Sequence, residues 1–277
     1  SSHGFHALGL MYPSTQGQNG CDMSRKPVGS TDLNCTARER HRVLTGEAVS
    51  YGGTDHTTNI TQPDSIQNRI AKALLKLGSP WKQWVTSAGV PDWANIIISG
   101  HSNGADHASF VAKTFNVSRA ITIAGANDMV DGPNPGTWDT VHPAPWQFAN
   151  TSAHATPPER MYGFGVCGTA AHKAEGECYD WHAGWLAQEY PGPWFRADSV
   201  LADASGKGLA GYHKICSNGS LVPARVGNHM ASAGDCCVPK TKAGDFLWTN
   251  IYKHMLLDPI GTTPAGPGTT ETCGCTV

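Results

Sequence analysis

Residues 94–124 read ANIIISGHSNGADHASFVAKTFNVSRAITIA, and this stretch decides the fold. An apolar run at 94–99 leads into the pentapeptide GHSNG at 100–104, then a helix-like segment at 105–115 and a second apolar run at 120–124. Strands that are apolar throughout and alternate with helices are typical of a parallel sheet covered on both faces. The stretch therefore predicts an α/β protein with a tight strand-to-helix turn at its centre.

The flanking sequence extends this pattern. Residues 64–78 have the apolar spacing of an amphipathic helix, with Asp64 expected as its N-cap and Gly78 as its stop. Strands are further expected at 5–12 and 160–166, and helices at 180–189 and 245–257. The last helix is expected to turn five apolar side chains inward: Phe246, Leu247, Ile251, Leu256 and Leu257. Residues 14–60 are polar and predict a long excursion pinned by Cys21 and Cys35.

Length and composition limit the class of protein. A chain of 277 residues is long enough for one α/β domain, which we expect at 1–258, with a lid or pocket insertion near 131–158 and a Pro/Gly/Thr-rich tail at 259–277. Charged residues make up 15% of the chain, and 20 basic side chains face 22 acidic ones, so no basic surface for nucleic acid is expected. No apolar run approaches the roughly 18 residues of a membrane-spanning helix.

Cysteine usage favours an oxidising compartment. The chain has nine cysteines, several of them in loop-like sequence, and the odd count leaves one without a partner inside the chain. The closing pair, Cys273 and Cys275, is expected to form disulfides rather than to hold a metal. Five Asn-x-Ser/Thr sequons agree with secretion: Asn34, Asn59, Asn116, Asn150 and Asn218. We therefore expect a secreted, disulfide-bonded glycoprotein.

The pentapeptide GHSNG carries the chemistry. A serine on a strained strand-to-helix turn needs small residues two positions before and after it, and Gly100 and Gly104 occupy those positions around Ser102. Such a turn exposes the hydroxyl, flanked by His101 and Asn103, and offers the Asn103 backbone N–H to a developing oxyanion. The competing interpretation is a Gly-rich loop that only ends a strand.

Strand, GHSNG, helix and strand together resemble the nucleophile elbow of the α/β-hydrolase superfamily. The resemblance runs from residue 5 to about 257 and extends to a branch of secreted hydrolases, through the segments LGLMYPST, PDSIQNRIAKAL, ISGHSNGADHASFVAK, AGANDM, PAPW and TPPERMYGFG. It implies a three-layer fold, with helices on both faces of a mostly parallel sheet. It also implies a catalytic order of serine, acid and histidine along the chain.

That order implies a triad in which Ser102 is the nucleophile and His229 the base, with His213 as the alternative base. The acid is expected after the 160–166 strand, at Asp180. Two further carboxylates stay open as the acid: Glu177 and Asp128. A Cys167–Cys178 disulfide would fix the shape of the loop before Asp180.

The function implied is hydrolysis of small-molecule or polymeric carboxylic esters through an acyl-enzyme, without a metal or another cofactor. Activity is expected to rise with pH through roughly 6–7 as the catalytic histidine loses its proton. The superfamily's second oxyanion donor follows strands that have no counterpart here, and His3-Gly4 precedes its strand instead of following one. A catalytically impaired binding protein of the same fold is therefore the alternative. A histidine-based metal hydrolase is a third reading, which the absence of H-x-x-x-H and H-E-x-x-H disfavours.

Overall fold

The computed structural model describes most of the sheet and the helices that pack on it. Its described residues are 4–11, 33–47, 60–126, 128–130, 142–148, 154–167, 177–197, 209–217, 231–233, 238–240, 244–262 and 264. Within these ranges, the backbone alone is described at 129, 130, 142 and 177–181.

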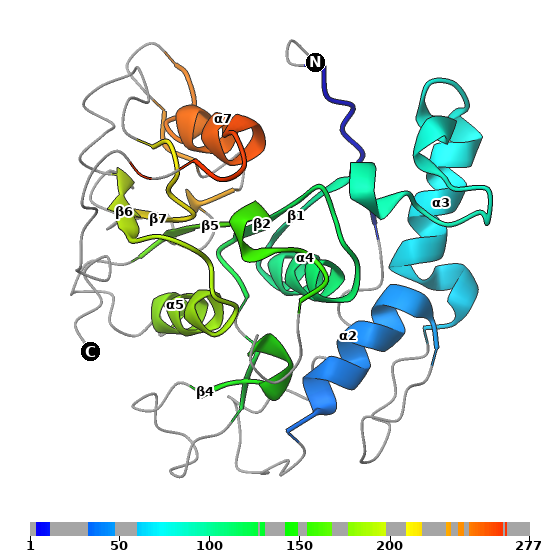
Figure 1. Cartoon of the computed structure of the whole chain (residues 1–277), viewed down its shortest axis with the longest axis horizontal. Coiled ribbons are helices and arrows are strands. Elements are labelled where there is room, and N and C mark those ends of the chain that lie inside the picture. The colour runs from blue at the N-terminus through cyan, green and yellow to red at the C-terminus, as the bar shows by residue number, and fades with distance from the viewer. Residues whose placement is uncertain are drawn as a thin grey trace.

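A five-stranded, all-parallel sheet forms the centre of the molecule (Figure 1). Its strands lie in the spatial order β1 (Ile97–His101), β2 (Arg119–Ile123), β5 (Met161–Val166), β7 (Lys214–Ser217) and β6 (Trp194–Arg196). Because all the strands run the same way, their carboxyl ends lie at one edge of the sheet. The chain therefore belongs to the α/β class, as its sequence predicts.

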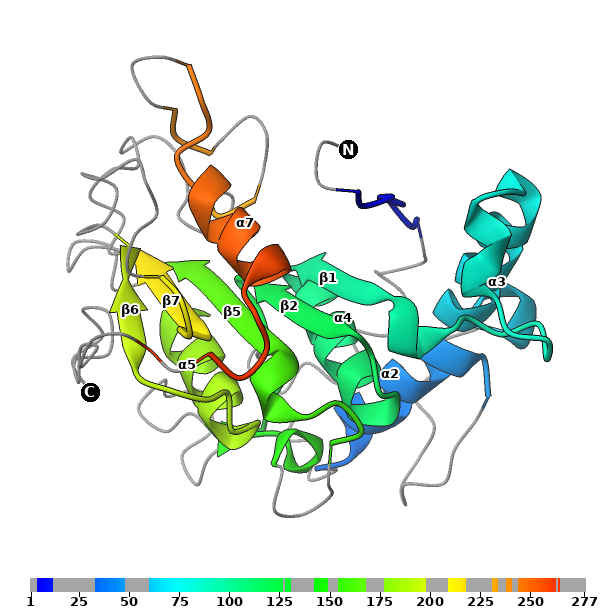
Figure 2. The ribbon, with the colours of Figure 1, turned by 45° about the horizontal axis from the view of Figure 1, so that its top comes forward.

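Helices cover both faces of this sheet. Helices α4 (Asn103–Thr114) and α5 (Glu177–Ala187) lie on one face, and α7 (Thr249–Leu257) lies on the other (Figure 2). Helix α2 (Cys35–Thr45) packs beside α4, and α3 (Ile66–Leu77) packs beside α2. A two-stranded antiparallel ribbon, β3 (Met129–Val130) and β4 (His142–Pro143), follows β2 in the chain.

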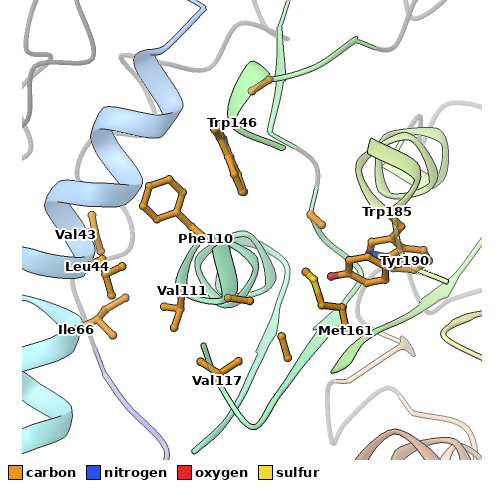
Figure 3. Close-up of a cluster of buried hydrophobic side chains, with 14 of the residues drawn as sticks. Val43, Leu44, Ile66, Phe110, Val111, Val117, Trp146, Met161, Trp185 and Tyr190 are labelled. Carbon is orange, nitrogen blue, oxygen red and sulfur yellow. The ribbon is translucent and has the colours of Figure 1, made fainter. Parts of the chain in front are cut away.

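Successive side chains of β2 enter two different hydrophobic cores, one on each face of the sheet. Ala120 faces the α4 side, where Phe110 and Val111 of α4 meet apolar side chains of α2 and α3 (Figure 3). Ile121 and Ile123 face the opposite side, with buried side chains of α7. This two-residue period places successive side chains on opposite faces of the strand. All five positions of β2 are buried, because side chains from the strand enter a core on each side of the sheet.

Residues 5–11 form no strand, so the predicted strand at 5–12 is wrong over its described part. Only Phe5 and Leu10 are half-buried there, and the rest of the segment is exposed. Among the described residues, β1 pairs with β2 alone and offers this segment no ladder. An apolar run becomes a strand only where a neighbour satisfies its backbone groups, which the sequence pattern does not reveal.

The 14–60 excursion contains helix α2, which the sequence analysis does not anticipate. Its sequence CTARERHRVLT is rich in charge, yet Arg38, Glu39 and Arg40 are buried. A charged stretch of this kind normally indicates a solvated surface. Helix α2 was missed because its burial depends on ion pairing with distant residues.

Two predicted details of helices α3 and α7 are corrected. Helix α3 is capped by Ser65, whose Oγ accepts the Asn68 N–H at 3.2 Å, and not by Asp64; Gly78 ends the helix as predicted. In α7 the buried side chains are Ile251 and Met255. Two of the five side chains expected to face inward are exposed: Phe246 and Leu257.

Three cysteines with described side chains are buried: Cys35, Cys167 and Cys216. The Cys178 side chain lies outside the described residues, so its pairing with Cys167 stays a prediction. Among the helices that the structure describes, none has the length and apolar character needed to cross a membrane.

Candidate active site at the β1–α4 turn

Ser102 occupies the turn between β1 and α4 in a conformation that few side-chain-bearing residues adopt. Its φ is 56° and its ψ is −129°. The Ser102 N–H donates to the Ile123 carbonyl at 2.9 Å, and its own carbonyl accepts the Ala105 N–H at 2.7 Å. Backbone strain of this kind persists only where the surroundings over-determine it. The surrounding backbone therefore holds the turn in this one conformation.

Close backbone approach explains the first glycine of GHSNG. A Cβ added at Gly100 would stand 1.9 Å from the Gly104 carbonyl oxygen. Gly125, which follows β2, is equally restricted, because its Cβ would stand 2.6 Å from the Ser102 carbonyl oxygen. The expected contact between the end of the strand and the start of the helix is thus present, and residue 102 itself is half-buried.

Helix α4 begins at Asn103, immediately after Ser102. The first N–H groups of a helix have no intrahelical acceptor, and they carry the positive end of the helix dipole. The Asn103 amide therefore belongs to the group of donors best suited to an oxyanion beside Ser102. The local backbone agrees with the elbow that the sequence predicts.

A buried guanidinium lies against this turn. Arg40 of α2 donates through Nη1 to Asn103 Oδ1, and the same nitrogen lies 3.0 Å from His107 Nε2. Its Nη2 contacts Asp106 Oδ2 at 3.3 Å. Arg40 therefore ties α2 to the first turn and a half of α4.

Asp128 is the second main partner of Arg40. Its Oδ1 accepts from Arg40 Nη2 at 2.7 Å and its Oδ2 accepts from Arg40 Nε at 3.1 Å, a two-pronged ion pair. Trp146 Nε1 donates to the same Oδ2 at 3.2 Å. Both carboxylate oxygens of Asp128 are thus engaged by groups other than a histidine.

Burial, together with the charge of Arg40, shifts the pKa of two groups in this cluster. Burial, reinforced by Arg40, holds the pKa of His107 well below its ordinary value. A neutral His107 accepts the Arg40 N–H through Nε2 and keeps its proton on Nδ1. Burial raises the pKa of Glu39 to about 7, although Arg40 opposes the shift. The site thus combines one permanent cation with two carboxylates, Asp106 and Asp128.

For the other predicted site residues, the structure describes either the backbone alone or nothing. Asp180 and Glu177 lie in the first turn of α5, which follows the carboxyl end of β5, but their side chains lie outside the described residues. His229 also lies outside them. No described histidine hydrogen-bonds to the Ser102 hydroxyl.

His213, the alternative base, lies at the wrong edge of the sheet. It precedes the first residue of β7, and its Nδ1 lies 2.9 Å from the Met161 carbonyl oxygen at the start of β5. Ser102 follows the carboxyl end of β1, at the opposite edge. Since the strands are parallel, His213 cannot serve as the base for Ser102.

The insertion near 131–158 contributes to the core. Trp146 is buried and packs edge-on against Phe110 of α4, with ring centroids 5.1 Å apart. The predicted lid or pocket insertion near 131–158 thus contributes at least this aromatic side chain to the core. Residues 131–141 and 149–153 lie outside the described residues.

Arg40 is the site residue that sequence reasoning missed. It lies 62 positions before Ser102, in a charged segment with no recognisable motif. Its long-range partners are invisible without the fold, so no sequence signal identified it.

Comparison of the chain with protein-family models, with curated proteins and with solved structures found no match. Among the described residues, no cluster of histidine, cysteine and carboxylate side chains is arranged to hold a metal ion.

Proposed function

We propose that this chain is a secreted serine hydrolase of the α/β-hydrolase type that cleaves carboxylic esters. One observation carries the proposal: Ser102, a residue with a side chain, takes φ 56° and ψ −129° at the carboxyl end of a parallel strand, directly before a helix. This backbone holds a hydroxyl above the sheet edge and beside helix N–H donors. A loop that merely ended a strand would not need that strain.

The order of the strands supports an assembled triad. Ser102 follows β1, Asp180 follows β5, and His229 comes after β7 in the chain. The three strands run parallel in one sheet, so the segments that leave their carboxyl ends start at the same edge. In addition, Ser102, Asp180 and His229 occur along the chain in the order serine, acid and histidine, which is the order that the superfamily uses.

In the proposed reaction His229 takes the proton of Ser102 as the hydroxyl oxygen attacks the ester carbonyl. The Asn103 N–H, at the start of α4, stabilises the resulting oxyanion. Collapse of the tetrahedral intermediate expels the alcohol, which receives the proton from His229 and leaves an acyl-enzyme on Ser102. Water activated by His229 then releases the acid and restores the hydroxyl.

Asp180 remains the proposed acid. Asp128 already gives both of its oxygens to Arg40 and Trp146, and it would have to abandon a buried ion pair to orient a histidine. Glu177 begins the same helix as Asp180 and stays the alternative. The geometry thus favours a carboxylate after β5 over the one after β2.

An impaired binding protein of the same fold stays the second candidate because of one observation. Residues 5–11 form no strand, so the described sheet contains no strand before β1 that a second oxyanion donor could follow. Loss of one such donor costs about 10²–10³ in rate.

The test is hydrolysis of p-nitrophenyl esters of increasing chain length by the wild-type chain and by Ser102→Ala. The proposal predicts turnover by the wild type that falls by at least about 10³ in the variant, with the folded state unchanged. Equal activity in the two chains would refute it. Ligand binding without turnover would favour the second candidate.

A further inference from the structure

We propose that Arg40 is a positioning residue for the reaction at Ser102: it holds the amide-bearing turn of α4 in place from helix α2. The inference rests on the proposed hydrolase function. Arg40 hydrogen-bonds to Asn103 and to other residues at the start of α4, and its role is exerted through these contacts. Arg40 lies 62 positions before Ser102, in a helix without any catalytic motif.

The contacts of Arg40 converge on the turn from two sides. On one side it binds Asn103, His107 and Asp106, all in the first five residues of α4. On the other side it binds Asp128, just beyond the carboxyl end of β2. Ser102 lies between these two anchors, since its N–H donates to Ile123 of β2 and its neighbour Asn103 begins α4.

Burial makes this arrangement stiff. The side chains of Arg40, Asp106 and Asp128 are 8%, 6% and 7% exposed. Removing one member of a buried ionic cluster leaves an uncompensated charge, so the network resists partial opening. A planar guanidinium with five N–H donors can satisfy this set of acceptors together, whereas an ammonium group is a single point charge. The site therefore requires arginine specifically.

The consequence for catalysis follows from the place of Asn103. Its side chain is held by Arg40 and its backbone N–H is the proposed oxyanion donor. An oxyanion donor acts only where the negative charge develops, and displacement by about 1 Å can cost about 100-fold in rate. Loosening the turn should therefore lower kcat and leave KM nearly unchanged, because substrate binding does not depend on that donor.

The kinetic experiment compares Arg40→Lys with Arg119→Lys. Arg119, the first residue of β2, is also buried, and it donates to the Met255 and Asp258 carbonyls. It therefore matches Arg40 in burial but lies at the edge of the sheet opposite Ser102. We expect Arg40→Lys to lower kcat about 10-fold to 100-fold, with KM within about twofold of wild type. Arg119→Lys should leave both constants near those of the wild type. An unchanged kcat in Arg40→Lys, with the wild type active, would overturn the proposal.

A second measurement separates this inference from the proposed function. Amide hydrogen exchange across 103–107 should become at least about tenfold faster in Arg40→Lys and remain unchanged in Arg119→Lys. Equal exchange in Arg40→Lys and wild type would overturn the positioning role, whether or not the chain hydrolyses esters. If the wild type shows no turnover, the hydrolase proposal fails, and selective exchange at α4 would still establish that Arg40 holds the turn.

Discussion

Ser102 shows how a single backbone conformation can point to a chemistry. A φ of 56° in a residue with a Cβ is strained, and the surrounding glycines explain how the chain tolerates it. Gly100 lets β1 approach Gly104, and Gly125 leaves room for the Ser102 carbonyl. These requirements are local and steric, and for that reason GHSNG could be interpreted from the sequence alone.

Replacing Gly100 by alanine should disrupt the turn. The new Cβ would stand 1.9 Å from a backbone oxygen, so the strand or the helix must shift, at a cost of about 2 kcal/mol or more in the free energy of unfolding. The measurement is a urea unfolding midpoint, with ester hydrolysis measured in parallel. Gly9→Ala is the matched control, because no atom lies within 4 Å of its added Cβ. Equal midpoints for the two variants would contradict the close approach.

Arg40 marks the limit of sequence reasoning at the residue scale. Its buried partners lie 63 to 88 positions away in the chain, and its own segment has the composition of a solvated helix. A motif is recognisable when its steric demands act between neighbours. A network assembled by the fold leaves no such trace.

At the scale of elements, α5 is seated on β5 through a glycine. A Cβ at Gly163 would come within 2.4 Å of Trp185 Cε2, and the indole Nε1 donates to Thr122 Oγ1 of β2 at 2.9 Å. The missing side chain thus allows a buried tryptophan to lie flat against the sheet. Helix α5 is thereby held with its first turn, which includes Asp180, beyond the carboxyl end of β5.

A double-mutant cycle tests this seating. Gly163→Ala should lower the free energy of unfolding by about 2 kcal/mol in the wild-type chain. In a Trp185→Phe background the same change should cost about 1 kcal/mol less, because the indole atoms that clash are gone. The measurement is chemical unfolding of the four proteins. Strict additivity would show that the glycine and the tryptophan do not interact.

Elements with strong apolar patterns were predicted well, and elements without such a pattern were not. The segments that became β1, β2, β5 and α4 have strong apolar patterns, and their observed bounds lie within three residues of the predicted ones. Strands β6 and β7 contain three and four residues and were missed. So short a run has too little pattern to stand out from a loop. In the sheet β7 pairs with β5, and β6 pairs with β7.

At the scale of the whole molecule, buried histidines couple stability to pH. Among the described histidines, burial is the largest cause that lowers the pKa of five: His107, His154, His182, His213 and His254. The pKa of His182 falls to about 3, in a site where its ring lies 4.0 Å from that of Trp194. Below about pH 6.5 the unfolded chain binds protons that the folded chain excludes, so stability falls as the pH decreases from 6.5 toward 3.

His182→Phe should remove one such contribution. Between pH 6.5 and 5 the wild type should lose about 2 kcal/mol more of its unfolding free energy than the variant does. The measurement is the urea midpoint of both proteins across that range. Comparing two chains at each pH cancels the opposite effect of Glu39, whose pKa burial raises to about 7. Parallel pH profiles would contradict a neutral, buried His182.

The arrangement of the whole sheet was partly visible in the sequence. Alternating apolar strands and helices predicted the α/β class, and the structure confirms that class. The unpaired segment at 5–11 was not foreseen, because strand pairing depends on neighbours that the local pattern does not specify. His229 and the side chain of Asp180 lie outside the described residues, so their assembly around Ser102 stays a prediction.

Labelling with a fluorophosphonate tests the central claim most directly, since only an activated serine reacts quickly with it. Peptide mapping by mass spectrometry should find one rapid adduct on Ser102, reduced in His229→Ala and absent in Ser102→Ala. An unreactive Ser102 in the folded wild-type chain, or an adduct that forms equally fast without His229, would contradict the account.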